Sequence, residues 1–154
     1  MKPVFDYKGS IILGMHDAIV SLTGLIAGLF FAFTDTKIIV LSCIISSVTA
    51  SLSMGAANYL AVKTTNKKHA LNAACATGCA YMITCLLLIL PFFVFYNKNT
   101  AILFVLIVSI LIIYLFNMIF YKKQQFYKHF FEMLTICLCV SILAFIIGNF
   151  AKYI

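Results

Sequence analysis

The chain has 154 residues, of which 64% are hydrophobic and only 10% are charged, and its formal net charge is +7. With a mean hydropathy of +1.11, it has far more apolar surface than a water-soluble core could bury, which excludes a soluble globular domain and predicts a polytopic membrane protein. We attribute the positive charge to membrane topology and attraction to lipid headgroups, so nucleic acid is not an expected partner.

Long apolar blocks predict membrane-spanning helices. We expect five of them, near residues 11–33, 38–62, 70–96, 101–121 and 130–150, each long enough for the ~20 residues that a spanning helix needs. Strands are not expected, because membrane barrels alternate apolar and polar residues, whereas residues 103–116 are almost continuously apolar. The predicted fold is therefore an all-α bundle that forms a single transmembrane domain over residues 1–154.

The first span contains Asp17, one of only four acidic residues in the chain. An ionisable group inside a membrane helix is costly and by default marks an ion, proton or substrate path. The alternative is an aspartate that is merely hydrogen-bonded at a helix start. Ser21 shares the helix face of Asp17. His16 is turned about 100° away, which favours a hydrogen bond or a partner on another subunit over joint ligation.

The same span also carries small residues at a spacing typical of close helix packing. Gly24 and Gly28 form a GxxxG pair, which lets another backbone approach the helix closely. We therefore predict that this pair packs a homodimer.

The second span carries a polar stripe on one face, formed by Ser47, Ser51, Met54 and Asn58. Asp17 and Met54 both lie about 13 Å in from the flanking lysines at 1.5 Å per residue, so the two faces could form one cation pocket. The carboxylate would supply charge, and the thioether would disfavour hard ions relative to Fe(II), Mn(II) or Zn(II). Alternatively, Met54 fills the core, the serines bond to their own helix, and Asn58 bridges two helices.

The polar junctions between the spans carry lysine unevenly, which predicts the orientation. With the N-terminus in the cytosol, the cytosolic side holds Lys2, Lys8, Lys63, Lys67, Lys68, Lys122, Lys123 and Lys128, and the other side holds Lys37, Lys98 and Lys152. The positive-inside rule favours this orientation, with the C-terminus outside. Lysine without arginine, together with abundant isoleucine, suggests an AT-rich genome, and we expect a bacterial inner membrane.

The remaining polar residues of the spans indicate no catalytic chemistry. The six cysteines all lie inside apolar blocks, so disulfides between loops are not expected. Glu132 lies only about 6 Å past Lys128 by helical rise, where a headgroup-level or loop-pairing role is expected. The spans contain no paired acids, no HExxH pattern and no nucleophile with a recognisable base, so we do not predict an enzyme.

Two segments resemble the vacuolar iron transporter family. Residues 14–28, GMHDAIVSLTGLIAG, are similar to the first-helix signature of that family, and residues 51–64, SLSMGAANYLAVKT, to its second-helix signature. The resemblance extends more weakly over all the spans. It implies a homodimer whose first helices line a path that moves Fe(II) or Mn(II) out of the cytosol in exchange for protons. By position, Asp17 and Met54 match the family's membrane metal ligands.

The chain departs from the family pattern at three points. Asn58 stands where the family usually has glutamate, which removes a negative charge and a proton-binding group. Residues 63–69, KTTNKKH, occupy the junction where many members insert a glutamate-rich metal-binding domain, so the chain resembles the shorter, nodulin-like branch. His16 replaces a residue that is commonly asparagine, and could compensate for Asn58 as a ligand or proton acceptor.

These features predict a proton-coupled exporter of divalent transition metals. We expect Asp17 to be protonated when the pocket is empty, because low dielectric favours the neutral carboxyl, and a cation then displaces the proton. Fe²⁺ or Mn²⁺ is the transported ion, and no cofactor is expected. The alternative is a non-transporting membrane subunit or scaffold, in which Asp17 pairs with a basic residue of a partner protein.

Overall fold

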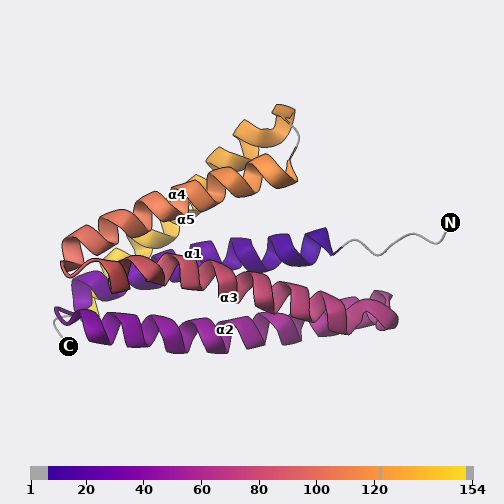
Figure 1. The fold of residues 1–154 in the computed structure, drawn as a ribbon, viewed down its shortest axis with the longest axis horizontal. Coiled ribbons are helices and arrows are strands. Elements are labelled where there is room, and N and C mark those ends of the chain that lie inside the picture. The colour runs from indigo at the N-terminus through magenta and orange to yellow at the C-terminus, as the bar shows by residue number, and fades with distance from the viewer. Residues whose placement is uncertain (1–6, 122, 152–154) are drawn as a thin grey trace.

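The computed structural model describes residues 7–121 and 123–151, so Lys2, Lys122 and Lys152 lie outside the described residues. The helices are α1 (Lys8–Ala32), α2 (Thr36–Thr65), α3 (Ala70–Val94), α4 (Lys98–Phe120) and α5 (Lys123–Ala151), with a short 3-10 helix, η1 (Lys67–His69), before α3. No strand occurs in the described residues, which confirms the all-α class (Figure 1).

In the described part of the chain, 5 helices are long and apolar enough to cross a membrane. Their bounds follow the predicted spans within a few residues, except that α5 begins at Lys123 and not near residue 130. Lysine and glutamine are good helix formers, so the polar junction before the last span continues as helix. Many large apolar side chains are exposed on the outside of the bundle, as expected for a protein whose solvent is lipid.

The ends of the helices define two ends of the bundle. Helices α1, α3 and α5 begin, and α2 and α4 end, at what we call the lysine-rich end, on the right of Figure 1. Lys8, Lys63 and Lys128 lie near it. At the opposite end, the Lys98 ammonium donates to the carbonyl oxygens of Phe30 and Phe33, both at 2.9 Å. These bonds satisfy carbonyl groups that the last turn of α1 leaves unpaired.

Helix α3 packs extensively against both α1 and α2, which contact each other much less (Figure 1). Glycines permit the close approach of α2 and α3. A Cβ at Gly55 would lie 3.3 Å from the carbonyl oxygen of Ala74, and one at Gly78 would lie 3.2 Å from that of Ser51. The serine side of α2, which was predicted to face α1, therefore lies against α3.

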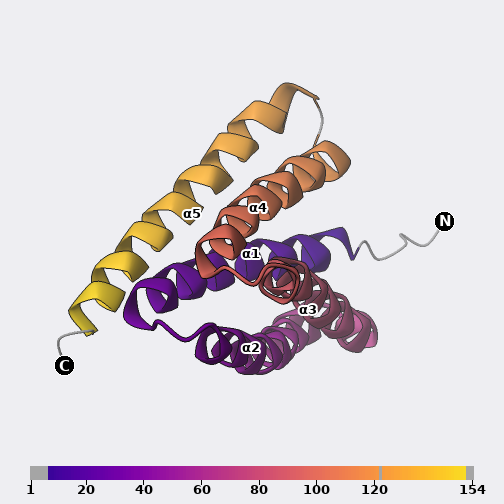
Figure 2. The ribbon, with the colours of Figure 1, turned by 60° about the vertical axis from the view of Figure 1, so that its left-hand side comes forward.

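Helix α5 packs along the other flank of α1, and Figure 2 shows α4 and α5 side by side and oblique to α1. A Cβ at Gly24 would lie 2.7 Å from Cγ1 of Val140, and one at Gly28 would lie 3.2 Å from the carbonyl oxygen of Ala144. The GxxxG pair was predicted to pack a second copy of the chain, but the structure uses it for α5 of the same chain. The physical reason is that a glycine face accepts whichever backbone approaches it, including one from its own chain.

Candidate ion site around Asp17

Asp17 lies in the interior of α1, nine residues after Lys8, or about 13 Å along the helix axis at 1.5 Å per residue. The alternative of a capping aspartate therefore does not apply. The residue is partly buried, and it makes no hydrogen bond or ion pair with another described residue. An ionised carboxyl group in a membrane span needs a compensating partner, and the neighbouring His16 acts on Asp17 electrostatically without forming an ion pair with it.

One turn further along α1, a hydroxyl pair links this face to α3. The hydroxyl oxygens of Ser21 and Tyr81 lie 2.7 Å apart. Ser21 is exposed, whereas the Tyr81 residue is 2% exposed and belongs to the core. Asp17 is also close enough to Tyr81 to act on it electrostatically. Asp17 and Ser21 thus lie on one face of α1, as the sequence predicts. The phenol of Tyr81 on α3, which the sequence analysis missed, lies beside them.

A signal for Tyr81 was present in the sequence of α3. Buried small or polar residues recur along one face of this helix at Ala70, Ala73 and Thr77, and the next position in this series is Tyr81. A tyrosine that continues a small-residue face in a membrane helix carries a polar group into the bundle. The spacing alone could have placed Tyr81 on the packed face, although it could not have named Ser21 as the partner.

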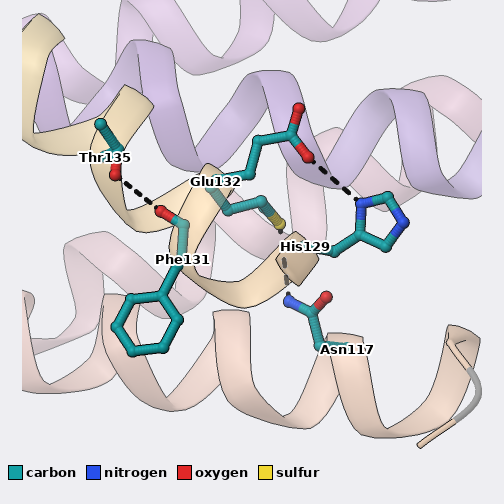
Figure 3. Close-up of polar contacts among 6 residues, drawn as sticks. Asn117, His129, Phe131, Glu132 and Thr135 are labelled. Atoms are coloured by element: carbon teal, nitrogen blue, oxygen red, sulfur yellow. Dashed lines mark hydrogen bonds and ion pairs between the residues drawn. The ribbon is translucent and has the colours of Figure 1, made fainter. Parts of the chain in front are cut away.

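His16 and Asp17 face different neighbours. His16 interacts electrostatically with Glu132 of α5 as well as with Asp17. Glu132 in turn lies 3.3 Å from Nδ1 of His129, one turn earlier on α5 (Figure 3). Glu132 therefore pairs within α5, and not with a loop as the sequence analysis considered. Among the described residues, no group of three or more His, Cys, Asp or Glu side chains could hold a metal ion.

Asn58 bridges three helices. Its amide nitrogen donates toward Oγ of Ser10 at 3.0 Å, Oγ1 of Thr77 at 2.6 Å and the carbonyl oxygen of Ala73 at 3.2 Å. These three contacts involve the amide nitrogen and leave aside the amide oxygen, the atom through which asparagine binds metal ions. Asn58 therefore has the bridging role considered as an alternative in the sequence analysis, while metal binding by its oxygen stays a prediction.

The other residues of the α2 stripe have contacts within α2 or with the core. Ser47 donates to the carbonyl oxygen of Cys43 at 2.6 Å, and Ser51 donates to that of Val48 at 2.9 Å. Met54 is partly buried and packs against the apolar core. None of these described contacts is with Asp17.

A groove of about 490 Å³ begins at Ser21 and runs along α1 and α5 away from the lysine-rich end. Its lining is almost entirely apolar and includes small residues such as Gly24, Gly28 and Gly148. The Asp17 face, one turn before Ser21, is therefore continuous with an open surface of the single chain.

A helical bundle of membrane-spanning length with a carboxyl group inside one span is typical of membrane proteins that move ions. Residues 9–70 match the model of the VIT family, which supports a relation to the vacuolar iron transporters over this part of the chain. The match covers α1 and α2 and ends at the first residue of α3. No curated protein matches the chain in sequence. Members of the family are transporters, so the match suggests metal-ion transport.

Proposed function

We propose that the protein exports a divalent transition-metal ion, Fe²⁺ or Mn²⁺, from the cytosol in exchange for protons. The observation that carries this proposal is the Asp17 carboxyl group, which is partly buried inside a membrane span and has no hydrogen-bond or ion-pair partner among the described residues. An unpaired charge is costly at that depth, so the group holds either a proton or a cation. Binding of one displaces the other, which couples the two fluxes.

The lysine distribution sets the orientation of the protein in the membrane, to which the proposed direction of transport refers. Under the positive-inside rule, the lysine-rich end faces the cytosol, so the N-terminus is cytosolic and the C-terminus lies outside. Metal enters from that end, exchanges with the proton on Asp17, and leaves on the other side when the helices rock about the site. For a bacterial inner membrane, this arrangement uses the inward proton gradient to expel metal.

We further propose that the working unit is a homodimer in which the Asp17 faces of two copies meet. One chain supplies few ligands, since the described residues contain no group of three His, Cys, Asp or Glu side chains that could hold a metal. The groove beside Ser21 leaves this side of α1 accessible. Met54 and His16 are the remaining candidate ligands, and helix movement or the second copy has to bring them to the ion.

The test is uptake of Mn²⁺ into proteoliposomes under an imposed pH gradient. Asp17→Asn removes the charge and the exchangeable proton, and we expect it to abolish pH-driven uptake. Asp35→Asn is the matched control. Asp35 is exposed and caps α2 by accepting a hydrogen bond from the backbone N–H of Lys37 at 2.8 Å. Asparagine caps helices as well as aspartate does, so this variant should transport like the wild type.

An internal pH dye in the same vesicles reports the proton flux. Equal Mn²⁺ flux in wild type and Asp17→Asn would eliminate the mechanism. Absence of both Mn²⁺ and Fe²⁺ flux in the wild type would eliminate the function. Metal uptake that leaves the internal pH unchanged would contradict the proton exchange and leave only metal transport.

A further inference from the structure

We propose that the hydroxyl pair of Ser21 and Tyr81 supplies neutral oxygen ligands beside Asp17 and thereby sets the preference of the site for hard over soft divalent ions. The inference rests on the proposed function, since it concerns the ion that Asp17 binds. Tyr81 lies outside residues 9–70, the part of the chain that matches the family profile, so the structure alone connects it with Asp17.

The position of the Tyr81 ring follows from the packing of α1 against α3. Gly14 lies directly against the backbone of Thr77, and one turn further along each helix come Ala18 and Tyr81, with exposures of 0% and 2%. Small residues at positions 14 and 18 leave room for an aromatic ring between the helices. Because the ring is held in the core, its hydroxyl group is fixed at the edge of the α1–α3 contact, where it meets Ser21.

The hydroxyl pair can serve Asp17 in both of its states. The 2.7 Å contact between Ser21 and Tyr81 uses one of their two hydroxyl hydrogens, and neither side chain has a further partner among the described residues. One O–H and several lone pairs therefore remain available. Ser21 follows Asp17 by four residues and shares its face. The O–H of the protonated Asp17 can donate to a hydroxyl oxygen of the pair, and when Asp17 holds a cation instead, an oxygen lone pair can turn to that cation.

The chemistry of these ligands favours some ions over others. Hydroxyl and carboxylate oxygens are hard donors that suit Mn²⁺, whereas Zn²⁺ binds well to nitrogen and sulfur ligands such as histidine and a thioether. Loss of the hydroxyl pair should therefore weaken Mn²⁺ binding more than Zn²⁺ binding. A purely structural role of the pair would weaken both to the same extent.

The experiment compares Tyr81→Phe and Ser21→Ala with wild type for the uptake of Mn²⁺ into proteoliposomes, with external Zn²⁺ as the competitor. We expect the KM for Mn²⁺ to rise about tenfold, the size of effect that one lost hydrogen bond to a charged group produces, with kcat nearly unchanged. The inhibition constant of Zn²⁺ should stay within about twofold of wild type on the same reasoning. Ser21→Thr retains a hydroxyl and should restore the wild-type KM.

Tyr114→Phe is the control for the chemical change, because Tyr114 lies on the outer surface of α4 with 49% exposure. An unchanged KM for Mn²⁺ in Ser21→Ala and Tyr81→Phe would overturn the proposal. So would a parallel rise in the KM for Mn²⁺ and the inhibition constant of Zn²⁺. If Tyr81→Phe fails to fold, Ser21→Ala decides, because Ser21 is exposed. Failure of the proposed function gives a different result. In that case Asp17→Asn would take up Mn²⁺ as fast as the wild type, or the wild type would take up none.

Discussion

Replacing Gly14 by alanine tests how closely α1 approaches α3 beside the ion site. A Cβ at this position would clash with the carbonyl oxygen of Thr77, and it would lie 3.1 Å from the carbonyl carbon and 3.2 Å from the Cα atom of the same residue. All three atoms belong to the backbone, so no change of rotamer relieves the contact. Helix α1 would have to move away from α3, which would also displace Asp17 one turn further on.

The expected magnitude is the difference of two opposing effects. Alanine favours a helix over glycine by about 1 kcal/mol. Overpacking a tight contact typically costs about 1–3 kcal/mol, and a backbone clash lies at the upper end of that range. The net effect is a destabilisation of about 1–2 kcal/mol by these two principles. For a chain of this size, that lowers the melting temperature by roughly 2–8 °C at about 2–4 °C per kcal/mol.

Gly9 offers a matched control in the same helix. A Cβ at Gly9 would meet no atom within 4 Å, so Gly9→Ala keeps only the gain in helix propensity and should be neutral or slightly stabilising. Thermal unfolding of the purified variants in detergent, followed by far-ultraviolet circular dichroism, measures both. If Gly14→Ala melts at or above the temperature of Gly9→Ala, the close approach of α1 and α3 is wrong.

Three further substitutions test other contacts by the same unfolding assay. Asn58→Ala leaves Ser10 and Thr77 without their amide partner and should cost about 1–3 kcal/mol; an unchanged melting temperature would mean that the bridge does not form. Lys98→Met removes both bonds to the end of α1 and should cost about 1 kcal/mol, while Lys98→Arg should retain most of the stability; equal loss in both would contradict a cationic cap. Gly148→Ala places a Cβ against the backbone of Gly28 and should cost about 1–3 kcal/mol; a neutral result would contradict the α1–α5 contact.

The fold class and the spans could be predicted from the sequence because they depend on the length and polarity of each segment alone. Residues sharing a helix face could also be predicted, since Asp17 and Ser21 follow the helical repeat. The neighbour of each face could not. Whether α2 or α3 lies nearest to Asp17 depends on close backbone approaches at Gly14, Gly55 and Gly78 together, and no single helix's periodicity contains that information.

Asn58 and the GxxxG pair also show that the sequence of one helix does not identify the helix it contacts. A buried asparagine satisfies its amide with whatever acceptors lie within reach, and here the carbonyl and hydroxyl oxygens of α1 and α3 provide them. Gly24 and Gly28 indicate a close helix contact in the sequence, but α5 of the same chain occupies it. A polar or glycine motif thus predicts that a contact exists, and only the assembled fold identifies the partner.

The occupation of Gly24 and Gly28 by α5 restricts how two copies of the chain can meet. Of the acidic residues that the structure describes, Asp35 caps α2 and Glu132 pairs with His129, which leaves Asp17 as the one without a hydrogen bond or ion pair. If the Asp17 faces of two copies meet, their carboxylates repel each other unless a divalent cation or protons lie between them. A cation that binds only the dimer stabilises it by mass action. Mn²⁺ should therefore raise the dimer fraction of the wild type in analytical ultracentrifugation but not that of Asp17→Asn, and an equal response of both would place the contact between copies elsewhere.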